Sequence, residues 1–203
     1  MNCLTCDTSK GYTFFKKTKN CLNCKYLNKY VNYEQTQCID KVPDGYYVDD
    51  TQINTIDKCY EKCLTCSDGS DNEKDMKCLT CDNTKGLYLL EGTTNCVKDI
   101  KEDEYLDPDD NIIKKCNKAC KTCSKKPIFN NEGDVTNCDS CNTDEGYYLI
   151  EGTTICSNKK KDSEYYDDEC KCYKKCYKDC LTCSGKEIDE YHMNCLTCDT
   201  SKG

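Results

Sequence analysis

"CYEKCLTCSDGSDNEKDMKCLTCDNTKGLYLLEGTTNC", residues 59–96, is the stretch that determines the fold of this chain. Its six cysteines follow the spacing Cys-x3-Cys-x2-Cys-x11-Cys-x2-Cys-x14-Cys. The same order returns in residues 116–156, where the central gap is 14 residues long, and it begins a third time at Cys176. A repeat of this kind predicts a series of small modules in which each module contacts mainly its neighbours.

A longer repeat encloses the short one. The segment "MNCLTCDTSKG" stands at residues 1–11 and again at 193–203, an offset of 192 residues. The third repeat lacks its last gap at the end of the chain, and Cys6-x14-Cys21 supplies that gap at the beginning. We therefore expect the chain to be a window, slightly longer than one 192-residue unit, of a tandem array in which Met1 is an internal residue.

This periodicity predicts four modules. Residues 1–58 are the later part of one repeat plus an extra loop, and residues 59–115 and 116–175 are complete repeats. Residues 176–203 are the first part of a repeat that continues as residues 1–58 of the next unit.

Composition indicates that covalent links replace a hydrophobic core. Leu, Ile, Val and Phe together make up 30 of 203 residues, about 15%, while charged residues make up 33%. Such a chain would ordinarily be disordered. Its 24 cysteines, nearly 12% of the residues, are instead typical of a disulfide scaffold. Disulfides at this density require an oxidising compartment, so we expect an extracellular or cell-surface location.

Two recurring elements between the cysteines predict β-hairpins. "KGLYLLEGTTNC" at 85–96 matches "EGYYLIEGTTIC" at 145–156 and, more loosely, residues 10–21, as a hairpin whose two arms are clamped by a disulfide. A Tyr-containing strand that enters an Asp-rich turn recurs at 44–59, 103–116 and 163–172. No segment shows the 3.6-residue apolar period of a helix. We expect a small disulfide-rich fold, an elongated rod of short β-hairpins and loops with no central hydrophobic core.

The paired CLTC segments at 63–66 and 78–81 also have the spacing of a zinc ribbon. A four-cysteine zinc site would leave the first and sixth cysteines of each repeat, such as Cys59 and Cys96, without a role. Disulfides use all six cysteines, so we favour disulfides and expect no metal and no cofactor.

The cysteine spacing, with its Gly-Tyr-Tyr context, resembles the furin-like, growth-factor-receptor cysteine-rich repeat over nearly the whole chain. The resemblance implies a rod of modules. It also implies that the first cysteine pairs with the third, the second with the fourth, and the fifth with the sixth. Carried over to this sequence, the implied pairs are Cys59–Cys66, Cys63–Cys78, Cys81–Cys96, Cys116–Cys123, Cys120–Cys138, Cys141–Cys156, Cys176–Cys183, Cys180–Cys195 and Cys6–Cys21.

Several cysteines depart from this pattern. We expect Cys24 and Cys38 to close one extra loop. A bond between Cys170 and Cys172, separated by one residue, would be strained, so we expect these two to pair elsewhere or with another chain. Cys3 and Cys198 are expected to lack an intrachain bond, because their partners would lie in the preceding and following copies.

Catalysis has little support in the sequence. The one histidine, His192, is expected to be a solvated turn residue, and no nucleophile–base pair, phosphate-binding loop or zinc-protease motif is present. The acidic turns at 107–111 and 167–170 could hold a hard cation, but they match no EF-hand and are more typical of solvated turns. We therefore expect no enzyme activity and no catalytic, cofactor-binding or metal-binding residue.

Charge and hydropathy limit the partners further. A net charge of −8 argues against nucleic acid, since binding to it needs clustered Lys and Arg. No apolar run approaches the roughly 20 residues of a membrane span. The expected partners are other copies of the same repeat, end to end and also laterally, together with glycans that the Thr pairs at 93–94 and 153–154 could carry.

Two functions fit these expectations. In the first, the protein is structural, a disulfide-stapled extracellular rod or filament built from tandem 192-residue units. In the second, it is the stalk or ligand-binding ectodomain of a cell-surface receptor or adhesin. The identity of all eleven residues across the long period favours the first, because a fibre benefits from identical units.

The choice between disulfides and zinc predicts opposite responses to two reagents. A reductant should unfold the chain, because the links that hold it are covalent, whereas a chelator without reductant should leave it folded. Circular dichroism before and after each reagent measures this. Unfolding by the chelator alone would support the zinc site instead.

Overall fold

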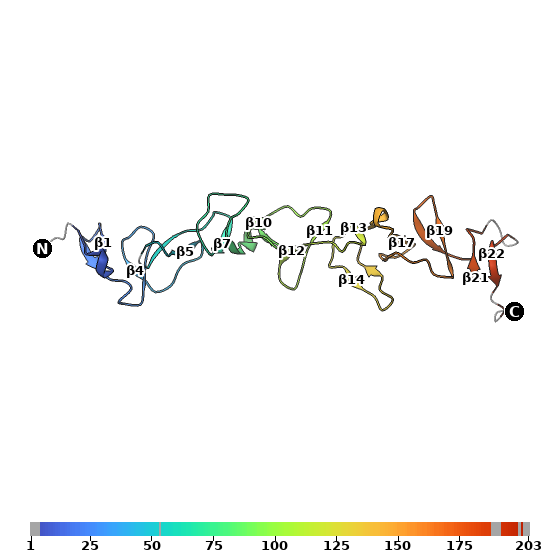
Figure 1. The fold of residues 1–203 in the computed structure, drawn as a ribbon, viewed down its shortest axis with the longest axis horizontal. Helices are drawn as coiled ribbons and strands as arrows, with labels where there is room; N and C mark the ends of the chain where they lie inside the picture. Colours follow the sequence, from blue (N-terminus) through green and yellow to red (C-terminus); the bar gives the residue numbers. More distant parts are fainter. Residues whose placement is uncertain (1–4, 53, 188–191, 199, 201–203) are drawn as a thin grey trace. The chain divides into compact units, whose positions relative to one another are not determined.

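Figure 1 shows the computed structural model of the chain, which describes residues 5–52, 54–187, 192–198 and 200. Two compact units lie within residues 1–99 and 100–203. Regular structure in the described residues consists of short strands and three 3-10 helices of three residues each. The predicted class, a small disulfide-rich fold of short hairpins with almost no helix, is confirmed. The module boundaries predicted from the cysteines stay a prediction.

The first unit consists of antiparallel hairpins, with one parallel contact between β3 and β6 that gives a sheet of order β4-β3-β6-β5. Its elements are η1 (Thr8–Lys10), β1 (Thr13–Phe15), β2 (Asn20–Leu22), β3 (Tyr30–Val31), β4 (Cys38–Ile39), β5 (Tyr46–Asp49), β6 (Thr55–Lys58), β7 (Cys63–Cys66), β8 (Cys78–Cys81), η2 (Asn83–Lys85), β9 (Tyr88–Leu90) and β10 (Cys96–Val97).

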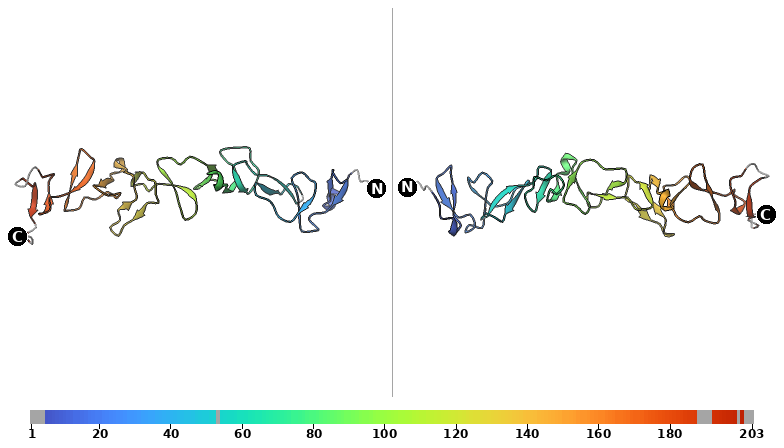
Figure 2. Two further views of the ribbon diagram at one scale, coloured as in Figure 1. Left: turned by 180° about the vertical axis from the view of Figure 1, so that it is seen from behind. Right: turned by 45° about the horizontal axis from the view of Figure 1, so that its top comes forward.

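The second unit repeats this plan, with a parallel contact between β17 and β20 inside a sheet of order β14-β15-β18-β17-β20-β19. Seen from two further sides, its described residues again show short strands, loops and a single short helical turn, η3 (Figure 2). Its elements are β11 (Glu104–Leu106), β12 (Ile112–Lys115), β13 (Cys120–Thr122), β14 (Ile128–Phe129), β15 (Val135–Thr136), β16 (Ser140–Cys141), η3 (Thr143–Glu145), β17 (Tyr148–Ile150), β18 (Cys156–Ser157), β19 (Glu164–Asp167), β20 (Cys172–Lys175), β21 (Cys180–Cys183) and β22 (Cys195–Cys198).

The hairpins lie where the sequence predicts them. β1–β2, β9–β10 and β17–β18 are the hairpins that end on a cysteine, and β5–β6, β11–β12 and β19–β20 are the Tyr hairpins with Asp-rich turns. A 3-10 turn precedes each of the first group and ends on a glycine with left-handed φ, for example +71° at Gly86. A side chain with a Cβ disfavours that conformation, which explains the recurring glycine.

The expectation that a disulfide clamps the two arms of these hairpins is wrong. Cys96 lies opposite Leu89 across the β9–β10 hairpin, and its sulfur bonds to Cys81 at the end of β8. A cysteine has no partner on the facing arm, where the sequence supplies a leucine. The disulfide therefore fixes the hairpin to the preceding strand pair, and its two arms pair as antiparallel strands.

Cys170 and Cys172 bond to each other, contrary to expectation. The two residues lie at the tip of the β19–β20 hairpin, and the residue between them, Lys171, has a φ of +53°. This left-handed residue reverses the chain sharply and brings the two Cα atoms to 5.2 Å, within the range that disulfides adopt. The sequence separation of two residues is therefore compatible with a bond because the turn is this tight.

No central core joins the hairpins. Buried apolar residues of the described part form four small clusters, and each contains cysteines with one to a few other apolar side chains. Phe15, Cys24 and Val31 make up one of these, and Tyr165 with Cys180 and Cys183 makes up another. Tyr148, Tyr166 and Tyr173 pack edge to face with ring centroids 4.9–6.1 Å apart. The tyrosines thus supply apolar area that aliphatic residues provide elsewhere.

Because the clusters are separate, a core mutation should act locally. Phe15→Ala removes a side chain that is fully buried, which should cost about 3–5 kcal/mol. Hydrogen exchange should speed up in β1–β4 and stay unchanged in β19–β22. The control is Leu22→Ala on β2, whose side chain is 38% exposed and should be nearly neutral. Faster exchange throughout the chain would contradict separate clusters.

Candidate functional site: the cystine framework

Twenty-two of the described cysteines form eleven disulfides. The structure brings together the nine pairs that the family resemblance implies, and it joins Cys24 to Cys38. Cα–Cα distances of 5.1–5.9 Å place every pair within ordinary disulfide geometry. The bonds close loops of 7, 14, 15 or 18 residues, apart from the short link at Cys170.

The two CLTC segments of a repeat form an antiparallel pair of strands. In β7–β8, Cys63 lies opposite Cys81 but bonds to Cys78, so the disulfide runs diagonally across the pair. Thr65 lies opposite Thr80, and their hydroxyl oxygens are 2.6 Å apart. This side-chain hydrogen bond was not expected from the sequence. The Thr at the third position of each CLTC segment is the feature that could have predicted it. It recurs between Thr122 and Ser140 and between Thr182 and Thr197.

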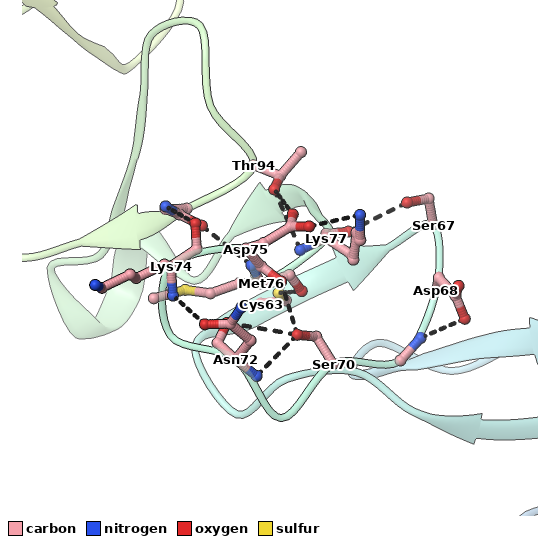
Figure 3. Close-up of polar contacts among 12 residues, drawn as sticks. Cys63, Ser67, Asp68, Ser70, Asn72, Lys74, Asp75, Met76, Lys77 and Thr94 are labelled. Atoms are coloured by element: carbon pink, nitrogen blue, oxygen red, sulfur yellow. Dashed lines mark hydrogen bonds and ion pairs between the residues drawn. The ribbon is translucent and has the colours of Figure 1, made fainter.

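The loop between β7 and β8 is held by its own polar side chains (Figure 3). The Oδ1 of Asn72 accepts a hydrogen bond from the backbone N–H of Lys74 at 2.9 Å. The hydroxyl of Ser70 donates to the carbonyl of Asp75 at 2.7 Å. The Asp75 carboxylate lies 2.6 Å from the ammonium of Lys77, which lowers the pKa of Asp75 and raises that of Lys77. These contacts link side chains and backbone within the eleven residues between the two strands.

This loop delivers one apolar side chain to the disulfides. The backbone N–H of Met76 donates to Asn95 Oδ1 at 3.0 Å, and the Met76 side chain is 2% exposed against Cys63, Cys78 and Cys96. Met193 packs against the corresponding cysteines of the third repeat, and Val135 packs against those of the second. Each cystine cluster is thus completed by an apolar residue two or three positions before the fourth cysteine of the repeat.

The Asp-rich turns begin with an aspartate that caps its own turn. Asp49, Asp107 and Asp167 each accept the backbone N–H of the residue two positions on, at 2.9–3.0 Å. Such an Asx-turn is the reason for aspartate at this position. The pKa of each of the three is lowered, mainly by side-chain hydrogen bonds from Thr51, Lys114 and Lys174 respectively, and the backbone N–H groups also favour the ionised carboxylate.

The Asp107 turn carries its own counter-charges. The Asp107 side chain is 1% exposed, and its Oδ2 lies 2.9 Å from Lys114 Nζ and 3.2 Å from Lys126 Nζ. Hydrogen bonding to Lys114 is the main reason that the pKa of Asp107 falls to about 2. Lys114 also contacts Asp110 at 2.5 Å. The two ammonium groups supply counter-charges to the carboxylates of this turn, which is therefore an internal ion-pair network. Within the described residues, no group of three His, Cys, Asp or Glu side chains is arranged to hold a metal.

Cys198 is the one cysteine of the described residues with a free thiol, and it is exposed. It lies on β22 opposite Cys180, whose sulfur is already bonded to Cys195. Cys3, the other cysteine expected to lack an intrachain bond, lies outside the described residues. His192 is exposed.

Comparisons with known proteins point to one class. Proprotein convertase subtilisin/kexin type 6 of Homo sapiens is 28% identical over 107 residues, which cover 53% of this chain and 10% of that protein. The type 5 proteins of Branchiostoma californiense and Rattus norvegicus are 31% and 28% identical over 168 and 169 residues, which cover 81% and 83% of this chain. The chain spans about a tenth or less of the length of these relatives. No family model and no solved structure matches.

These similarities, at about 30% identity, support a furin-like cysteine-rich repeat family for this chain. Eleven disulfides require an oxidising compartment and indicate a secreted or extracellular domain. Among the helices of the described residues, none has the length and apolar character needed to cross a membrane.

The Asp107 network predicts a specific pH dependence. Its folded pKa, about 2, lies below its ordinary value of 3.8, so the stabilisation is present above pH 3.8 and is lost as the pH falls toward 2. Asp107→Asn should lower the melting temperature at neutral pH, and the difference from the parent chain should shrink as the pH approaches 2. Calorimetry over a pH series measures this. Asp109→Asn is the control, since its carboxylate is 72% exposed and its pair with Lys126 contributes little. A difference that stays constant with pH would contradict the network.

Proposed function

We propose that the chain is part of a structural extracellular protein in which tandem 192-residue units join end to end into a disulfide-stapled rod or filament at the cell surface. The proposal is non-enzymatic. The observation that carries it is the free thiol of Cys198. The segment around Cys198 occurs twice in the chain, and in its first copy the equivalent cysteine is bonded.

Two identical segments support this continuation. Cys198 occupies the position of Cys6 in the eleven-residue segment that occurs twice. Cys6 bonds to Cys21 across a Cα–Cα distance of 5.7 Å, and this bond fixes the β1–β2 hairpin. A unit continuing after residue 203 would present an equivalent hairpin and cysteine to Cys198. One covalent module would then begin in one unit and end in the next.

The framework suits a load-bearing role. Each loop of about 15 residues closed by a disulfide is stabilised by roughly 3 kcal/mol in the chain-entropy model. Because these bonds recur in each repeat, stability is distributed along the chain. Modules that depend on their neighbours alone can be added without limit, as in other repeat proteins.

A ligand-binding ectodomain is a second candidate, and one observation favours it. The repeat at 116–156 has a gap between its third and fourth cysteines that is three residues longer than that of the repeat at 59–96, and this gap contains the β14–β15 hairpin. This hairpin exposes Ile128 by 55% and Phe129 by 65%. A binding protein places its recognition residues in one distinctive repeat, whereas a fibre does not need such a feature. Loss of cell-surface binding in Ile128→Ser/Phe129→Ser, with assembly unchanged, would favour this candidate.

The end-to-end bond can be tested in a chain that repeats residues 12–203 once after Gly203. Peptide mapping under non-reducing conditions should recover Cys198 linked to the second copy of Cys21. In the single-unit chain, Cys198 should instead be alkylated without prior reduction. Replacing the second copy of Cys21 by Ser should leave Cys198 reactive in the longer chain as well. The second copy of Cys198 has no following unit and should stay reactive. If the first copy of Cys198 also stays reactive in the unmodified two-unit chain, end-to-end continuation is contradicted.

A further inference from the structure

The β1–β2 hairpin has a strand edge that equivalent hairpins use. Parallel strands β6 and β20 add to β3 and β17, the first strands of two other cysteine-ended hairpins. β1 has β2 as its single strand neighbour in the described residues. Glu151, directly after β17, donates its backbone N–H to the carbonyl of Tyr173 on the added strand β20, at 2.9 Å. The corresponding N–H on β1, that of Lys16, donates to no described residue. An edge of this kind can pair with another strand.

A groove follows this edge. Its lining includes Tyr12, Phe14 and Lys16, together with Gln35 and Gln52 from the turns after β3 and β5. The lining combines aromatic side chains with amide groups that can hydrogen bond to a backbone. An extended peptide fits a groove of this form by adding a strand to β1.

The hairpin that carries the edge is strongly basic. Residues 8–33 contain six lysines and no Asp or Glu, although the whole chain has a net charge of −8. Since this segment contributes +6, the remainder of the chain carries −14. Lys16, Lys17 and Lys19 are exposed at the hairpin tip and have no acidic partner among the described residues. At the equivalent tips the sequence is Glu-Gly-Thr-Thr, so the positive charge is specific to this hairpin. The edge therefore favours an acidic strand.

The chain itself supplies a strand of the required chemistry. β19 ends its sheet, with β20 as its one strand neighbour in the described residues. Asp162, Asp168 and Glu169 flank it and are exposed, and Asp168 alone among them has a lysine contact, with Lys171. The other Asp-rich turn of this unit is neutralised by Lys114 and Lys126. Lys159, Lys160 and Lys161 precede the strand, so its acidic charge lies at the carboxyl end, and this end matches the basic tip that follows β1.

We propose that the open edge of β1 binds the acidic edge strand β19 of a second copy of this chain. The contact joins two different surfaces, so it repeats from copy to copy and produces open lateral growth. This contact extends the proposed structural role. It also rests on that role, because the contact is treated as part of a filament. The partner is a copy of the chain because the charge and the strand edge that the groove requires are both present in it.

Sedimentation velocity of the full chain tests this contact. Cys198→Ser is the background, so that an end-to-end disulfide cannot contribute and failure here is distinct from failure of the proposed function. The chain should self-associate with increasing concentration at low ionic strength. It should dissociate near 1 M salt, where the Debye length is about 3 Å.

Charge reversal separates the proposed contact from general repulsion. Lys16→Glu/Lys17→Glu/Lys19→Glu should weaken association by about tenfold. The matched control is Lys98→Glu/Lys121→Glu/Lys125→Glu, which reverses three exposed lysines that belong to neither edge, adds the same charge and should leave association unchanged. Asp162→Lys/Asp168→Lys/Glu169→Lys should also weaken association, and a mixture of this variant with the first should restore it.

Backbone pairing has its own test. Lys16→Ala and Lys16→Pro both remove the ammonium group, but only proline removes the N–H of the strand edge. Association should be weaker for the proline variant than for the alanine variant. The proposal is overturned by a chain that is monomeric at every salt concentration, by equal effects of the two lysine triplets, by a mixture that does not associate, or by equal association of the two Lys16 variants.

Discussion

The disulfide that links a hairpin to the strand pair before it is the interaction on which this fold depends. Cys81 at the end of β8 bonds to Cys96 at the start of β10, while Cys63 and Cys78 lock the strand pair itself. Between these bonds lie few apolar side chains, of which Met76 is the largest that is almost fully buried. Two-stranded hairpins of this length are at best marginally stable by themselves. Covalent links therefore fix arrangements that packing alone could not maintain.

The same logic explains the loop that stands outside the six-cysteine pattern. Val31 lies opposite Cys38 as Leu89 lies opposite Cys96, and in both hairpins the second strand begins at the bonded cysteine. Asn28 has a φ of +55° near the position where the longer hairpins have a left-handed glycine. Residues 24–38 thus form a shortened copy of the cysteine-ended hairpin, and β6 adds to it as β20 adds to β17.

The cysteine spacing and the Tyr and Gly positions were sufficient to predict the hairpins, because these features are local. The bond between Cys170 and Cys172 was not predictable from separation alone, since it depends on the left-handed conformation of Lys171. The parallel contacts of β3 with β6 and of β17 with β20 join strands from different hairpins, and no short sequence pattern encodes them. The open edge of β1 is visible only by comparison with those contacts. Local sequence features thus predict the individual hairpins, whereas the pairing of strands from different hairpins is known only from the structure.

The central claim is that cystines stabilise this chain module by module, and removal of one cystine tests it most directly. Cys63→Ala/Cys78→Ala deletes the diagonal bond of β7–β8 without leaving a free thiol. In a two-dimensional amide NMR spectrum, the account predicts that signals from residues 59–96 lose dispersion while those from β19–β22 keep their positions. Loss of dispersion across the whole chain would show that a shared core holds the fold. An unchanged spectrum would show that the bond is dispensable, and either result would contradict the account.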